Sequence, residues 1–168
     1  MRSKLQFANR IYENRGRNLV VKAFKAIFLI FVALIIFVPE EALAMDLSQF
    51  QWKNRLLFLF APNGNHPLFK NLQSQIMAQK AEVEDRDLVV FEVPAQGPSR
   101  MNAAPIDPQV ADSIRDHFAI PRNTFSLILV GKDGSIKLKR NDPVDIGAVF
   151  ELIDSMPMRQ NEIRQKTQ

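Results

Sequence analysis

The stretch that decides the fold is Leu56-Leu57-Phe58-Leu59-Phe60, followed at once by Ala61-Pro62-Asn63-Gly64-Asn65. A short continuous apolar run that ends in turn-forming residues is typical of a strand buried on both faces of a sheet. Residues 88–93 and 125–130 repeat this character. Because helices cover both sides of sheets built from such strands, the sequence predicts an α/β protein.

Helical periodicity fills the segments between the strands. Pro67 suits the first turn of a helix, which is expected to end in the polar stretch 82–87. Asp107-Pro108 and Asp142-Pro143 each resemble a cap followed by a first-turn proline, and they open two further helices. The loop Gly131-Lys132-Asp133-Gly134 is typical of a hairpin that leads into an alternating, half-exposed strand.

The predicted element order is therefore β-α-β-α-β-β-α. Strands joined by helices are expected to run parallel through right-handed crossovers, and the final hairpin adds an antiparallel pair. A mixed sheet between two helical layers is the thioredoxin-like three-layer α/β/α sandwich, which is the predicted fold. Residues 47–52 are expected to add a short edge strand, and the segment with Gly97, Pro98 and Pro105 to form a loop.

Residues 1–44 are typical of an export leader. Seven basic residues face one acid in residues 1–25, an apolar run covers residues 26–38, and Ala42-Leu43-Ala44 suits a cleavage site. A 13-residue run spans roughly 20 Å as a helix, short of the ~30 Å membrane core, which favours cleavage. The alternative is an uncleaved membrane anchor. Residues 45–163 then form a periplasmic, secreted or externally anchored domain with a polar tail, residues 164–168.

The composition excludes several classes of function. The chain has no Cys, so a disulfide framework, a thiol nucleophile and cysteine-dependent redox or peroxidase chemistry are excluded. Residues 45–168 carry 15 Lys+Arg and 15 Asp+Glu, and this neutral balance argues against nucleic acid as a partner. With two His in the chain, no metal site is predicted. No cofactor is predicted either, and the membrane is a partner only through an uncleaved leader.

Several segments resemble the family called domain of unknown function 4174. The resemblance rests on residues 125–134 with Lys137, residues 153–159 with Glu162, residues 47–55 and residues 85–88, and it covers most of residues 46–163. It implies a thioredoxin-like fold near the peroxiredoxins, with no established activity. Family members are exported bacterial proteins, and related modules occur in extracellular vertebrate sushi-repeat proteins.

The peroxiredoxin pattern P-x-x-x-T-x-x-C can be laid on this chain from Pro62. His66 then falls at the Thr position and Phe69 at the Cys position, and Phe cannot attack a peroxide. Arg122 resembles the arginine that precedes the third strand in peroxiredoxins, but here it has no thiolate to support.

Two groups of residues are candidate binding sites, and no catalytic residue is predicted. Asn63, Asn65, His66 and Arg122 are expected near a helix N-terminus, where free N–H groups suit an anion or a peptide terminus. The alternative is that the asparagines make the turn, His66 caps the helix and Arg122 is solvated. Chemistry at His66 would need an orienting carboxylate that no sequence pattern supplies.

The second group is an interaction patch, Met156, Met158 and Arg159, which interrupts the last helix. The alternative is that the methionines pack the helix end and Arg159 is bonded internally. The predicted function is an exported, redox-inactive module that binds an unknown protein, peptide or small ligand. The alternatives are an enzyme with thiol-independent chemistry near His66 and Arg122, and a membrane-anchored accessory subunit.

Overall fold

The structure, a computed structural model, describes residues 45–166, so the predicted leader and the last two residues of the tail lie outside the described residues. One mixed sheet of six strands has the order β4-β3-β2-β1-β5-β6. Its strands are β1 (Arg55–Ala61), β2 (Leu88–Pro94), β3 (Arg100–Met101), β4 (Ala104–Pro105), β5 (Ser126–Val130) and β6 (Ile136–Arg140).

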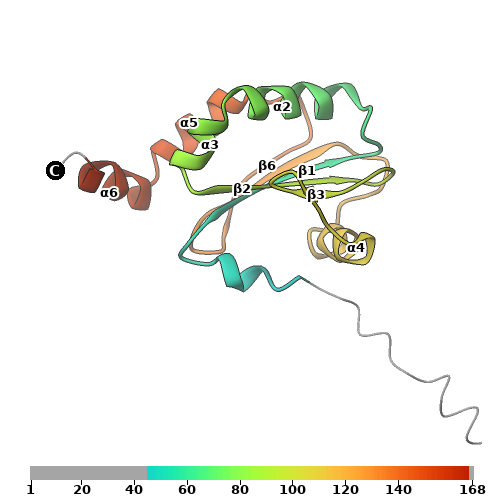
Figure 1. The fold of residues 1–168 in the computed structure, drawn as a ribbon, viewed down its shortest axis with the longest axis horizontal. Helices are drawn as coiled ribbons and strands as arrows, with labels where there is room; N and C mark the ends of the chain where they lie inside the picture. The colour runs from blue at the N-terminus through green and yellow to red at the C-terminus, as the bar shows by residue number, and fades with distance from the viewer. Residues whose placement is uncertain (1–44, 167–168) are drawn as a thin grey trace, which may run out of the picture. The chain divides into compact units, whose positions relative to one another are not determined.

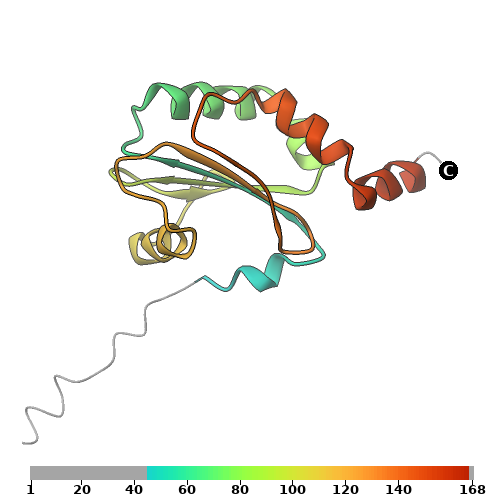
Figure 2. The ribbon, with the colours of Figure 1, turned by 180° about the vertical axis from the view of Figure 1, so that it is seen from behind.

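Helices cover both faces of this sheet, as predicted. Figure 1 shows α2 (Pro67–Ala78), α3 (Lys80–Asp85) and α5 (Ile146–Asp154) on one side of the sheet, and α4 (Pro108–His117) on the other. The view from behind in Figure 2 shows the same three layers. The predicted thioredoxin-like α/β/α sandwich is confirmed.

The central strand β1 supplies both hydrophobic cores. Every residue of β1 is buried. Leu57 and Leu59 point into the core under α2 and α5, whereas Phe58 and Phe60 point into the core under α4. Because successive side chains of a strand face opposite sides, a continuous apolar run is what a doubly covered strand requires.

One predicted strand direction is wrong. β1 and β2 are parallel, as expected, but β5 runs antiparallel to β1, with Ser126 opposite Phe60 and Val130 opposite Leu56. The reason is the path of α4, which does not carry the chain back along the sheet. Near the end of α4, Arg115 bonds to the carbonyls of Ala61 and Val93, so the chain still lies at the carboxyl ends of β1 and β2.

Two predictions of local structure are also corrected. Residues 47–52 do not form an edge strand: Leu47–Phe50 is a short 3-10 helix, η1, because the Asp46 side chain caps it at the Ser48 N–H. The expected loop after β2 contains the hairpin β3–β4. Asn102 and Ala103 turn the hairpin with positive φ, and Asn102 exchanges hydrogen bonds with the backbone of Val90.

The bounds of three helices differ from the prediction. The polar stretch that was expected to end the first helix instead contains α3, and the last helix begins at Ile146 behind the Asp145 cap. Met156-Pro157 does interrupt the helical region, and a separate helix, α6 (Pro157–Lys166), follows. Residues 164–166 of the predicted polar tail are thus helical, and Lys166 forms an ion pair with Asp85 of α3 at 2.7 Å.

Candidate functional site

The two groups of candidate residues lie at opposite ends of β1. Asn63, Asn65 and His66 follow its carboxyl end, whereas the Gly131–Gly134 loop and the start of α6 lie near its amino end, where Leu56 pairs with Val130. Seven residues of extended strand separate these ends, which corresponds to roughly 20 Å.

At the carboxyl end, each predicted residue is engaged locally. The Asn63 side chain accepts from the Asn65 N–H at 3.0 Å, which is the turn chemistry expected of asparagine. His66 occupies the cap position of α2 but makes no side-chain cap bond; its ring stacks on Phe125 with centroids 5.7 Å apart, and its Nδ1 is buried without a partner. Arg122 is exposed and forms an ion pair with Asp112 at 2.9 Å.

These contacts do not converge on a common space. In residues 45–166 no hydrogen bond or ion pair joins His66 to Arg122. Phe69, which falls at the peroxiredoxin Cys position, lies in the first turn of α2 with its ring buried in the core. The position that the peroxiredoxin pattern assigns to the Cys is thus occupied by a buried phenylalanine ring.

Arg115, which the sequence reasoning did not single out, is the buried cation at this end. Its guanidinium donates to the carbonyls of Pro121, Ala61 and Val93 and lies over the Phe60 ring at 5.2 Å. Burial lowers the pKa of Arg115, and the nearby Arg122 lowers it further. No pattern in the sequence could identify it, because an arginine on a short helix is ordinarily a surface residue.

At the amino end of β1, Glu162 of α6 holds two buried cations. Arg55, only 1% exposed, donates both terminal nitrogens to the Glu162 carboxylate at 3.0 and 3.2 Å. Lys132 of the hairpin loop lies 2.8 Å from Glu162 and 2.8 Å from Asp87. Because a buried charge is costly unless it is paired, these contacts tie α6 to β1 and to the hairpin, and the hairpin to Asp87 just before β2.

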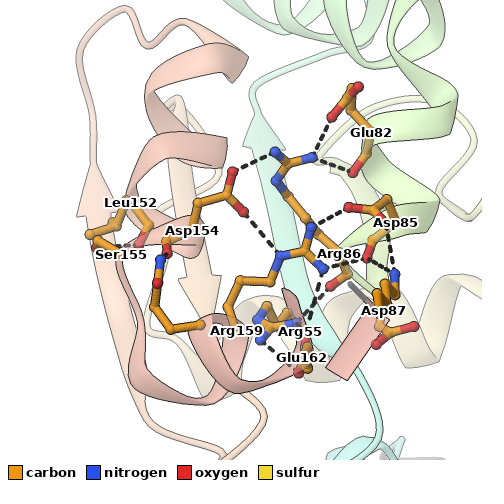
Figure 3. Close-up of polar contacts among 12 residues, drawn as sticks. Arg55, Glu82, Asp85, Arg86, Asp87, Leu152, Asp154, Ser155, Arg159 and Glu162 are labelled. Carbon is orange, nitrogen blue, oxygen red and sulfur yellow. Dashed lines mark hydrogen bonds and ion pairs between the residues drawn. The ribbon is translucent and has the colours of Figure 1, made fainter. Parts of the chain in front are cut away.

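The same network continues through Arg159 and Arg86, as Figure 3 shows. Arg159 is buried; it forms an ion pair with Asp85, donates to the Asp85 carbonyl and contacts Asp154 at 3.0 Å. Arg86 pairs with Asp154 at 2.5 Å and with Glu82 at 2.6 Å. The guanidinium of Arg159 is therefore bonded internally, which is the alternative stated for the interaction patch.

These contacts lower the pKa values of the acids in the network. The hydrogen bonds from Lys166 and Arg159 lower the pKa of Asp85 from 3.8 to about 2. Burial opposes ionisation of Glu162, but hydrogen bonds from Arg55 and Lys132 outweigh it and lower its pKa. Asp85 and Glu162 are therefore ionised at neutral pH, and their contacts weaken in acid.

The two methionines of the patch line a cavity beside the network. This cavity of about 260 Å³ is enclosed by the α5–α6 junction, the hairpin and the start of β1; its walls are Arg55, Gly131, Lys132, Asp133, Lys137, Met156, Pro157 and Met158. Met156 is partly buried against the α2–α5 core, and Met158 is 39% exposed. The structure thus joins Met156 and Met158 at one cavity, with Arg159 behind it.

The hairpin loop Gly131–Gly134 stands between this cavity and a second one. A cavity of about 480 Å³ on the α4 face is also lined by Gly131 and Asp133, together with Phe50, Phe118 and Ile136. Ile136 is 52% exposed. Trp52 is 64% exposed and has a positive φ of 65°, and its N–H donates to the Lys132 carbonyl at 2.6 Å.

Trp52 bonds to this loop through its backbone, and Ile136 and Met158 each line a cavity that the loop also lines; we call residues 131–134 with these three residues the hairpin surface. The positive φ of Trp52 is strained, because bulky residues rarely adopt the left-handed region. The family resemblance could have pointed to this surface. Three of the segments that carry it, residues 85–88, 131–134 and 153–162, meet in the ion-pair network around Glu162 and Arg159. Their separation along the chain concealed the contact.

The sheet order and the helical layers define a thioredoxin-like protein, one with no cysteine in its sequence. Its solved structural relatives include the reduced 2-Cys peroxiredoxin of Plasmodium vivax, with a TM-score of 0.52 and 10% identity over 70% of this chain and 85% of that chain. At this identity the likeness shows the fold alone. The chain belongs to the family described as Domain of unknown function (DUF4174), whose family model matches residues 46–162.

Curated relatives contain this segment as a small part of longer chains. Coiled-coil domain-containing protein 80 of Danio rerio is 27% identical over 133 residues, which span 70% of this chain and 15% of that protein. The sushi repeat-containing protein SRPX of Homo sapiens is 29% identical over 134 residues, 78% of this chain and 29% of that protein.

Two further observations concern residues 45–166. No helix in this range is both long and apolar enough to cross a membrane. In the same range, no three His, Cys, Asp or Glu side chains are grouped so that they would hold a metal ion.

Proposed function

We propose that this chain is an exported, redox-inactive module that binds a protein or peptide at the hairpin surface. The observation that carries the proposal is the hairpin loop, which lines two cavities, with exposed Ile136 in the wall of one and exposed Met158 in the wall of the other. Exposed apolar side chains beside cavities are typical of interaction sites, and Trp and Met are well suited to them.

Support for the absence of redox activity comes from the carboxyl end of β1. The chain has no Cys, and the residue at the peroxidatic position, Phe69, is buried. The leader sequence in residues 1–44 supports export. The relatives named sushi repeat-containing proteins support the idea of a module, because the shared segment forms 29% of their length.

Photo-crosslinking in cells tests the surface. A photoreactive amino acid replaces Met158 or Trp52, and a matched control replaces Met77, which is 74% exposed on α2 away from the hairpin. We expect one discrete crosslinked species from the first two positions and none from the control. Equal crosslinking at all three positions, or none at any, would contradict the proposed surface.

A second measurement tests the proposed export. The mass of the N-terminus of the protein recovered from cells is expected to correspond to a start at Met45. If the recovered chain keeps residues 1–44 and stays with the membrane, the hypothesis of a free exported module is wrong and that of a membrane-anchored subunit is supported. Peroxide turnover by the purified, cofactor-free protein would contradict redox inactivity.

A further inference from the structure

The last helix, α6, is attached to the domain in a different way from α2 and α5. Three apolar side chains of α2 and four of α5 are buried. The buried residue of α6 is Arg159, whereas its large apolar side chains, Met158 and Ile163, are 39% and 36% exposed. Burial of an apolar face is what ordinarily holds a helix against a domain, so α6 depends instead on its charged groups.

Ion pairs attach α6 to β1, α3, α5 and the hairpin loop. Figure 3 shows Arg159 and Glu162 pointing from α6 toward their partners. Glu162 lies 3.0 Å from a nitrogen of Arg55 and 2.8 Å from the nitrogen of Lys132. The pairs that reach from α6 to the rest of the domain are Arg55–Glu162, Lys132–Glu162, Asp85–Arg159, Asp154–Arg159 and Asp85–Lys166.

Salt can reach the acids of these pairs. The side chains of Glu162, Asp154 and Asp85 are 21%, 33% and 43% exposed. The distance over which salt screens a charge falls from about 10 Å at about 0.1 M to about 3 Å at about 1 M, which is close to the length of the Glu162 contacts. High ionic strength therefore weakens the attachment of α6, whereas the apolar contacts of α2 and α5 persist.

The junction between α5 and α6 is built as a hinge. Pro157 has no N–H and cannot continue the hydrogen-bond ladder of α5. That ladder closes before it, where the N–H groups of Ser155 and Met156 donate to the carbonyls of Glu151 and Ile153 at 3.0 and 2.9 Å. A rotation at this junction can therefore move α6 without breaking a hydrogen bond of α5.

We propose that α6 is a detachable helix that closes the smaller cavity beside the hairpin. When its ion pairs are screened or removed, α6 leaves as a unit and the rest of the domain stays folded, because the local stability of a protein is not uniform. Pro157 and Met158 leave with it, so the cavity of about 260 Å³ loses part of its wall and opens along the hairpin loop. This inference rests on the proposed function, because it names how access to the hairpin surface is controlled.

Hydrogen–deuterium exchange of the purified full chain tests the detachment. We expect residues 158–166 to exchange about 3- to 10-fold faster at about 1 M NaCl than at about 0.1 M, while α2 exchanges equally at both. Glu162→Gln is expected to speed the exchange of α6 at least ~10-fold at the lower salt concentration, because two cations lose their shared carboxylate. The matched control is Glu84→Gln, which removes an exposed pair on α3 and is expected to leave α6 unchanged.

A single thiol tests whether the cavity opens. The chain has no Cys, so Met156→Cys places one thiol in the half-buried wall of the cavity. Met77→Cys is the matched control, because Met77 is 74% exposed on α2. We expect alkylation by a maleimide at position 156 to become about 3- to 10-fold faster at about 1 M NaCl, and alkylation at position 77 to keep its rate.

Each outcome decides the inference separately from the proposed function. Exchange of α6 in step with β1 at both salt concentrations overturns the inference, because α6 then leaves only when the whole domain unfolds. Exchange of α6 that neither salt nor Glu162→Gln alters overturns charge as its attachment. Detachment without faster alkylation at position 156 overturns control of the cavity. The crosslinking at Trp52 and Met158 decides the proposed function independently of all three results.

Discussion

Replacement of Glu162 by glutamine is expected to destabilise the protein by about 3 kcal/mol, because it leaves two buried cations without their shared carboxylate. Glu162 contacts Arg55 at 3.0 Å and Lys132 at 2.8 Å. Unit charges 4 Å apart attract by about 4 kcal/mol at an effective dielectric constant of about 20. Removing one partner of a buried pair costs about 3–5 kcal/mol, since the remaining charge stays desolvated.

The contacts that remain place the expected loss at the lower end of this range. Lys132 keeps Asp87 at 2.8 Å, and Arg55 keeps the Arg86 carbonyl at 2.8 Å. The Glu162 side chain is also partly exposed, so water screens part of its charge.

Urea unfolding at pH 7, followed by far-ultraviolet circular dichroism, measures this loss. With an m value of about 2 kcal/mol/M, the midpoint is expected to fall by about 1.5 M. The matched control is Glu84→Gln, because Glu84 makes an exposed pair with Lys80 at 3.6 Å, for which about 0.5 kcal/mol or less is expected. If Glu162→Gln and Glu84→Gln were equally stable, the network would not hold α6, and the reasoning would be refuted.

Three further predictions concern acid, the buried guanidinium and the peroxidatic position. The pKa of Asp85 is lowered to about 2 from 3.8 and that of Glu162 is lowered from 4.5, so their contribution to stability is full above about pH 5 and is lost as pH falls towards 2. Urea midpoints measured between pH 7 and pH 3 test this, and midpoints that stay constant as the pH is lowered from 4.5 to 3 would disprove it. Arg115→Met is expected to cost about 2 kcal/mol, because buried carbonyls lose their donor, whereas Arg122→Gln, at an exposed pair, is expected to cost less than about 1 kcal/mol; equal unfolding free energies would contradict the role of Arg115. Phe69→Cys is expected to cost about 3 kcal/mol and to give a thiol that iodoacetamide alkylates only after denaturant is added, and rapid alkylation of the native variant would show that the position is open.

The sequence predicted the layers well because each layer depends on local patterns. The unbroken apolar run of β1 required cover on both faces, and the helical periodicity after Pro67 supplied part of that cover. The direction of β5 could not be predicted in this way. It depends on α4 remaining at one end of the sheet, and that position is recorded in a long-range contact, from Arg115 to the carbonyl of Ala61.

The site was predictable only in part, for the same reason. Met156 and Met158 were recognised from their unusual position in a helix, but their cavity is completed by Lys132 and Lys137 from a distant hairpin. Arg159 has no local feature that distinguishes a buried cation from a solvated one. Its burial follows from Asp85, which lies 74 residues earlier in the chain.

The span of the Arg55–Glu162 contact has a consequence for the timing of folding. Arg55 opens the first strand, yet the carboxylate that neutralises it comes 107 residues later. During synthesis, the Arg55 guanidinium at the start of β1 cannot be buried with its carboxylate partner until α6 has been made. The contact that neutralises Arg55 can therefore form only after α6 has been synthesised, so the final helix completes the burial of the central strand.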